Sequence, residues 1–100
     1  MIEPVAPVAR RPRLVFFYSP LSGRCRRTEG FIAQVLQRRR NHDTFDVVRV
    51  SIDENPGLAT KFHIYEVPTI CVVDDAKLRL SLVSPRGCRQ LELALEPWLR

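Results

Sequence analysis

The 100-residue sequence lacks the features of membrane, fibrous and disordered proteins. No apolar run approaches the ~18 to 20 residues that a membrane-spanning helix requires. Only 4 glycines and 8 prolines are present, too few for a fibrous protein, while a hydrophobic content of 45% is too high for a disordered chain. The length is also too short for two domains, so we expect one compact globular domain.

Residues 1–13 do not have the pattern of a secretory signal peptide. Residues 1–13 contain Pro4, Pro7 and Pro12 and have neither a basic start nor a continuous apolar segment. We therefore expect a cytoplasmic protein whose 3 cysteines are reduced. We expect a monomer with a flexible lead-in over residues 1–13 and a folded domain over residues 14–100.

Motifs for metals and cofactors are missing. His42 and His63 have no cysteine, histidine or acid at ligand spacing, so we interpret both as surface residues and predict no metal site. There is no glycine-rich phosphate loop and no Gly-x-Ser-x-Gly motif, and we predict no cofactor. The pair Asp74-Asp75 is typical of a hairpin turn, not of a catalytic acid pair.

Positive charge is concentrated in the first part of the chain. Residues 1–40 contain 9 arginines and 2 glutamates, and residues 41–100 carry a net charge of −2. The arginines form three clusters: Arg10, Arg11 and Arg13; Arg24, Arg26 and Arg27; and Arg38, Arg39 and Arg40. Such clusters suit an anionic partner, including nucleic acid. We favour a solvated helix face and a basic arm, because no aromatic residues are interleaved with the charges.

The apolar pattern predicts alternating strands and helices. Strands are expected at 14–18, 45–52, 69–73 and 78–82, with Leu78, Leu80 and Leu82 on one buried face. Helices are expected from Gly23 to about Arg39, from Pro56 to about Phe62, and along the stripe Leu91, Ala94, Leu95, Trp98 and Leu99. Ser22 is a candidate N-cap, and Arg38 to Arg40 are expected at the negative end of the first helix dipole.

The predicted order is β-α-β-α-β-β-α. The first two strands are expected to be parallel, joined by a right-handed crossover, and the last two to form an antiparallel hairpin. We therefore predict an α/β fold with a four-stranded mixed sheet and helices on both faces.

Two motifs in this order resemble the thioredoxin family. Ser22-Gly23-Arg24-Cys25 stands at the start of the first helix, and Val67-Pro68-Thr69 precedes the third strand. Residues 51–69 are similar to the "IDxNP" turn, short helix and "VPT" of thioredoxins, and the similarity runs from Leu14 to about Leu99. The resemblance implies a minimal thioredoxin fold of sheet order 2-1-3-4, with Pro68 in a cis peptide.

The sequence departs from the family at its reactive motif. Thioredoxins use a Cys-x-x-Cys pair, in which the first thiolate attacks and the second thiol resolves the mixed disulfide. Here Ser22 occupies the first position, and a serine hydroxyl cannot form a disulfide. Phe16 stands where the family usually keeps a buried aspartate, and Leu21 replaces a tryptophan. The motif therefore predicts thiol-redox chemistry through Cys25 alone, without dithiol exchange.

Two interpretations of Cys25 remain open from the sequence. As a reactive thiol, it would lie at a helix N-terminus beside Arg24, Arg26 and Arg27, with Ser22 donating a hydrogen bond to the thiolate. Residues 17–25 also resemble the peroxidatic loop of peroxiredoxins, which places a threonine three residues before the reactive cysteine. As a core residue, Cys25 would continue the apolar stripe of the helix.

The other two cysteines carry weaker signals. Cys71 lies in an apolar strand and is predicted to be in the core. Cys88 lies near the start of the last helix and is a candidate exposed thiol. A disulfide between Cys25 and either Cys71 or Cys88 remains possible from the sequence, since only the structure supplies the required separation.

The resemblance also implies a peptide-binding groove at Pro68. In thioredoxin-like proteins the backbone beside the cis-proline pairs with an extended peptide by strand addition. The residues implied to line this groove are Val67, Pro68, Thr69, Tyr18, Leu21, Ser22 and Arg24. Two functions follow as hypotheses: a single-thiol redox protein acting on a partner thiol, and a redox-inactive module that binds a protein through this groove and the basic helix face.

Overall fold

A computed structural model describes residues 11–99 of the chain, apart from the side chain of Arg39. Its elements follow the predicted order, with one additional short helix. They are β1 (Arg13–Tyr18), α2 (Gly23–Gln37), the 3-10 helix η1 (Arg38–Asp43), β2 (Asp46–Ser51), α3 (Pro56–Lys61), β3 (Thr69–Asp74), β4 (Lys77–Val83) and α4 (Cys88–Leu95).

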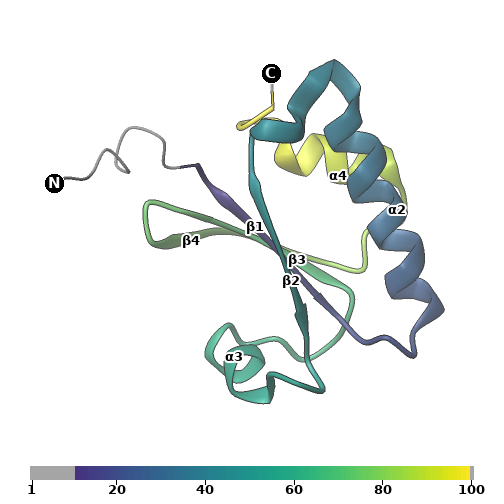
Figure 1. Ribbon diagram of the computed structural model, residues 1–100, viewed down its shortest axis with the longest axis vertical. Helices are drawn as coiled ribbons and strands as arrows, with labels where there is room; N and C mark the ends of the chain where they lie inside the picture. The colour runs from purple at the N-terminus through teal and green to yellow at the C-terminus, as the bar shows by residue number, and fades with distance from the viewer. Residues whose placement is uncertain (1–10, 100) are drawn as a thin grey trace, which may run out of the picture.

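The four strands form one mixed sheet in the order β2-β1-β3-β4, as the resemblance implies. Strands β1 and β2 are parallel, whereas β3 is antiparallel to both β1 and β4. Helices α2 and α4 lie on one face of the sheet and α3 lies on the other (Figure 1). The predicted minimal thioredoxin fold is therefore confirmed.

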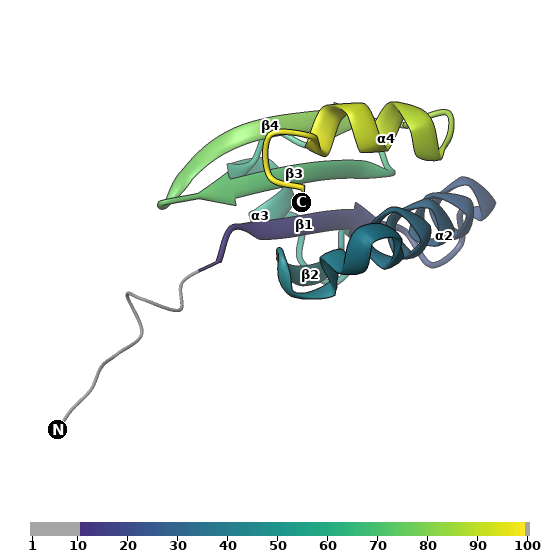
Figure 2. The same ribbon diagram turned by 90° about the horizontal axis from the view of Figure 1, so that it is seen from above.

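Strand β1 is the centre of the core, because its side chains are buried on both faces. Leu14 and Phe16 pack toward α2 and α4, while Val15 and Phe17 pack toward α3. A strand covered on both faces reads as a continuous apolar run, and this run is what predicted a buried strand. Figure 2 shows the strands side by side, with α2 and α4 on the near side of the sheet and α3 behind it.

The end of α2 differs from the prediction. The helix ends at Gln37, and the three arginines that follow lie in η1, outside the last turn of α2. The buried Asn41 explains the change of helix type: its Nδ2 donates to the Arg38 carbonyl at 3.0 Å, and its Oδ1 accepts from Thr44 Oγ1 at 2.7 Å. Side-chain bonds of this kind compete with the regular α-helical pattern.

The hairpin between β3 and β4 corrects the expected burial of β4. Its turn contains Asp75 and Ala76 at positive φ, as a tight two-residue hairpin turn requires. A bulge then shifts the register between Val72 and Val73. Leu80 and Leu82 pack on the α2 side as expected, but Leu78 is 49% exposed and lies beside Phe62 on the opposite face. The bulge places one extra residue in β4 between Leu78 and Leu80, so these two side chains point to opposite faces of the sheet.

Most of the predicted lead-in lies outside the described residues. Of its last residues, Arg13 opens β1, and the Pro12 carbonyl accepts the Asp46 amide at 3.0 Å. Arg11 forms an ion pair of 3.7 Å with Asp46. Within residues 11–99, no helix has the length and apolar character to cross a membrane.

Replacing Gly30 with alanine is expected to stabilise the protein. Gly30 lies at an exposed position inside α2, and a Cβ added there meets no atom within 4 Å. Alanine restricts the unfolded chain, so we expect about 1 kcal/mol more unfolding free energy in urea. The matched control is Ala33→Gly, at another exposed position of the same helix, which should cost a similar amount. Equal stability of both variants and the native chain would contradict this reading of α2.

Candidate functional site

The N-terminus of α2 is built around Ser22, as predicted. Ser22 has extended backbone angles, and its Oγ accepts the Cys25 amide at 3.3 Å. Its own amide donates to the Ser19 carbonyl at 3.1 Å, which closes the turn between β1 and the helix. The Ser22 hydroxyl therefore satisfies one of the free amides of the first helical turn.

The structure places Cys25 in the core, which is one of the two interpretations that the sequence left open. The residue is only 3% exposed and belongs to the core cluster beneath α2. Its Sγ also accepts a hydrogen bond from the Ser19 amide at 3.4 Å. The sulfur thus lies in the first turn of a helix with a backbone donor directed at it.

A pocket of about 300 Å³ opens beside this sulfur. Its wall includes two groups that the sequence analysis did not identify, Glu29 and Arg49, which form an ion pair of 2.7 Å. The Arg49 guanidinium lies 5.3 Å from the centre of the Tyr18 ring, and that ring stacks on Phe16 at 5.6 Å. The remaining lining residues are Ser19, Pro20, Ser22, Cys25 and Arg26.

Arg49 was not predictable as a site residue, because it occupies an ordinary exposed position of a strand. Only the parallel register, in which Phe16 of β1 stands opposite Arg49 of β2, brings its side chain to Tyr18 and Glu29. Strand register is not encoded in a local motif. The alternation of β2 alone therefore gave no signal for this contact.

The structure divides the predicted site residues between two places. Tyr18, Ser22 and Cys25 line one pocket. Arg24 points elsewhere and lines two pockets beside the β4–α4 connection, with Ser84 and Arg86 in both. Leu21 is 90% exposed and stands out from the turn before α2.

The predicted cis peptide at Pro68 is present, between Val67 and Pro68. The buried Pro68 offers its carbonyl to the Ser84 amide at 2.8 Å, and Thr69 Oγ1 donates to the Glu66 carbonyl at 2.7 Å. These bonds fix the loop ahead of β3. None of Val67, Pro68 and Thr69 lines the pocket beside Cys25.

All three cysteines are free thiols. Cys71 is fully buried, as predicted, and it packs on the α3 side of the sheet, away from the cluster that contains Cys25. Burial raises the pKa of the Cys71 thiol, and a hydrogen bond with Ser81 opposes this effect in part. Cys88 is half-buried and its Sγ donates to Gln34 Oε1 at 2.9 Å.

The histidines occupy the places expected of them. His42 and His63 are both exposed. Among residues 11–99 no group of three or more histidine, cysteine or acidic side chains is placed to hold a metal ion. The candidate site is defined by Cys25, because this cysteine lines a pocket and lies in the first turn of α2.

These features define an α/β protein of the thioredoxin fold. A thioredoxin mutant from Halobacterium salinarum NRC-1 superposes with a TM-score of 0.76 at 21% identity, covering 91% of this chain and 77% of that one. The protein Trxlp from Edwardsiella tarda EIB202 gives a TM-score of 0.75 at 17% identity, covering 90% and 84%. At these identities the likeness establishes the fold alone.

The chain belongs to the thioredoxin family, since the family model for thioredoxin matches residues 4–96. Thioredoxin from Griffithsia pacifica is 33% identical over 69 residues, which is 69% of this chain and 62% of that protein. Thioredoxin 1 from Synechococcus elongatus is 33% identical over 66 residues, 66% of this chain and 60% of that protein. The matched segment thus spans less than two thirds of either relative.

Proposed function

We propose that the protein is a thiol-redox protein that works through the single thiol of Cys25. The thiolate attacks one sulfur of a disulfide R–S–S–R′, so that a Cys25–S–S–R bond forms and R′–S⁻ leaves. A second thiolate from solution then attacks the R sulfur, which releases Cys25 as a thiolate and a new disulfide. No second thiol of the protein takes part, because Ser22 occupies the position from which one would act.

The observation that carries this proposal is the environment of the Cys25 sulfur. It receives the Ser19 amide at 3.4 Å, lies in the first turn of α2 and borders a pocket lined by Arg26 and by Arg49, whose guanidinium is paired with Glu29. Amide donors, a helix N-terminus and guanidinium groups all stabilise an anionic sulfur. Ser22 supports the same state, because its Oγ accepts the Cys25 amide and its hydroxyl proton is left to donate.

The low exposure of Cys25 limits which disulfides reach it. Cys25 is 3% exposed and lines a pocket whose volume of about 300 Å³ suits a small disulfide or one extended side chain. We propose a partner that presents its sulfur on an extended segment. The implied groove residues Val67, Pro68, Thr69, Tyr18, Leu21 and Arg24 would guide that segment. The Val67 amide and carbonyl suit strand addition, because they have no hydrogen-bond partner among the described residues. Such chemistry suits the reducing cytoplasm, which we propose as its location.

A second candidate function is a redox-inactive module that binds a protein beside Pro68. The observation that favours it is the exposure of two large apolar side chains near the motifs: Leu21 is 90% exposed and Tyr65 is 87% exposed. Exposed apolar groups of this size are typical of contact surfaces. In this function Cys25 is a core residue, and its thiol is not required.

Alkylation and disulfide exchange at pH 7 test the proposal. The reduced native protein is treated with iodoacetamide, or with a small aromatic disulfide, and each cysteine is followed by peptide mass. We expect Cys25 to react at least tenfold faster than Cys71, whose thiol is fully buried and has a raised pKa. The Cys25→Ser variant should lose mixed-disulfide formation, whereas Cys88→Ser should retain it.

The two functions make opposite predictions in this experiment. If Cys25 reacts only after unfolding in urea, at the same rate as Cys71, the redox proposal fails. Retention of partner binding by Cys25→Ser would then support the binding module. Circular dichroism of each variant establishes that the fold is intact before rates are compared.

A further inference from the structure

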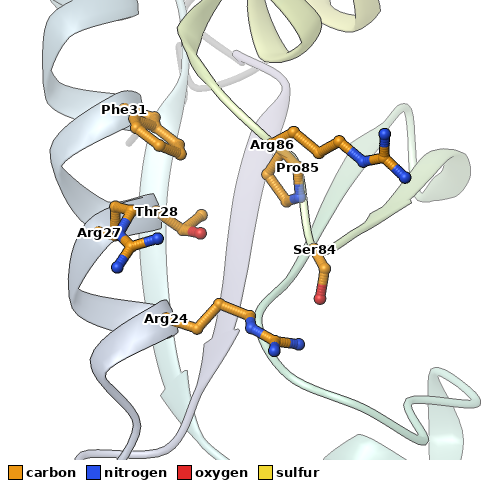
Figure 3. Close-up of a pocket in the computed structure, with 7 residues that line it drawn as sticks. All are labelled: Arg24, Arg27, Thr28, Phe31, Ser84, Pro85 and Arg86. Carbon is orange, nitrogen blue, oxygen red and sulfur yellow. The ribbon is translucent and has the colours of Figure 1, made fainter.

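A second pocket lies between α2 and the connection from β4 to α4. Figure 3 shows its seven lining residues, which are Arg24, Arg27, Thr28, Phe31, Ser84, Pro85 and Arg86. Its volume is about 340 Å³. This pocket shares no lining residue with the one beside Cys25, so it is a separate feature of the same helix.

Two hydroxyl groups in this pocket lack partners. Thr28 is 1% exposed, and its Oγ1 forms no hydrogen bond within the described residues. Its side chain points from α2 into the space between the helix and the Ser84–Arg86 segment (Figure 3). Ser84 Oγ is likewise buried without a partner. Buried hydroxyls are nearly always hydrogen-bonded, so two unpaired ones at the wall of one pocket give it unused hydrogen-bonding capacity.

The charge around the pocket is of one sign. Its wall contains three arginines and no acidic residue, and none of the three forms an ion pair within residues 11–99. The Arg24 side chain extends from α2 toward the segment that carries Ser84, whereas the Arg86 guanidinium points away from α2 (Figure 3). Arg24 and Arg86 also line an adjoining pocket in which Glu66 is the one acid.

We propose that this pocket binds the phosphate group of a small phosphomonoester. A phosphate dianion presents three free oxygens, which accept hydrogen bonds from guanidinium groups and from the Thr28 and Ser84 hydroxyls. Phe31 and Pro85 form an apolar wall for the organic part of the ligand. The proposal does not depend on Cys25, because this pocket and the one beside Cys25 share no lining residue, although Arg24 also belongs to the implied peptide groove.

Titration of the full chain with phenyl phosphate, inorganic phosphate and phenol tests this proposal. Isothermal calorimetry at 50 mM salt should give saturable binding of phenyl phosphate, at least tenfold tighter than that of inorganic phosphate, and no binding of phenol. Raising the salt to 200 mM should weaken the phenyl phosphate complex. Equal affinity for the two phosphates, or no saturable binding of phenyl phosphate, would overturn the assignment. Binding of an oligonucleotide without binding of phenyl phosphate would overturn it as well.

Variants then locate the site. Arg24→Gln and Arg27→Gln should each weaken phenyl phosphate binding at least fivefold, while the matched control Arg79→Gln, an exposed arginine of β4 outside the pocket, should stay within twofold. Thr28→Val keeps the shape of the side chain but removes the unpaired hydroxyl. It should weaken binding several-fold while Tm stays unchanged or rises, whereas a merely structural role for Thr28 would leave the affinity unchanged. Native affinity in Thr28→Val and in the Arg24→Gln/Arg27→Gln double variant would refute the site.

Discussion

Replacing Ser22 with cysteine is expected to create a protein-disulfide reductase. Ser22 caps α2 with its Oγ 3.3 Å from the Cys25 amide, so a thiol at this position would lie at the same helix terminus. The new thiolate would attack a substrate disulfide, and Cys25 would then displace the reduced substrate and form an intramolecular disulfide. We expect Ser22→Cys to reduce insulin disulfides, with dithiothreitol as electron donor, at least tenfold faster than the unchanged chain.

The control for this gain is the double variant Ser22→Cys/Cys25→Ser, which has an attacking thiol and no resolving one. It should accumulate mixed disulfides and show little turnover. Loss of the serine cap is expected to cost about 1 kcal/mol of stability, which a thermal melt would register. If Ser22→Cys folds and forms its intramolecular disulfide but shows no reductase activity, then Phe16 and Leu21 have removed functions that a thiol alone does not restore.

Replacing Phe17 with alanine is expected to cause a large loss of stability. Phe17 is fully buried on the α3 side of β1, with its ring 5.3 Å from that of Phe62. Truncation removes the ring from the cluster that holds α3 against the sheet and leaves a cavity. We expect a loss of about 3–5 kcal/mol in urea unfolding, with a fall in Tm on the order of 20 °C.

Leu21→Ala provides the matched control, because it truncates an apolar side chain that the fold does not bury. Its effect should stay within about 0.5 kcal/mol. A loss of less than about 1 kcal/mol for Phe17→Ala would mean that the α3 layer contributes little to the cooperative fold.

Strands with strong local signals were predictable from the sequence. The run from Leu14 to Tyr18 identified a strand buried on both faces, and Asn55-Pro56 correctly located the start of α3. The Ser22 cap was also confirmed, because capping depends on a few neighbouring residues. Signals of this kind are local, so one sequence is enough to read them.

Features set by contacts between distant segments were not predictable. The bulge that turns Leu78 to the α3 face depends on the pairing of β3 with β4. The end of α2 depends on the buried side chain of Asn41, which resembles any polar loop residue in the sequence. The pocket of Thr28 and Ser84 joins residues 56 positions apart, and only the packing of the β4–α4 connection beside α2 brings them together.

The order of the sheet also affects how the protein behaves at high concentration. Among residues 11–99, β2 and β4 are the two edges of the sheet, and each leaves a row of backbone donors and acceptors without a neighbouring strand from this part of the chain. Both edges carry exposed charges, Asp46 and Arg49 on β2 and Lys77 and Arg79 on β4. A second molecule that added its own β4 at the β4 edge would bring positive charges together, and a strand added at the β2 edge would strip Asp46 and Arg49 of water. We therefore expect these charged edges to oppose the growth of fibrils by strand addition.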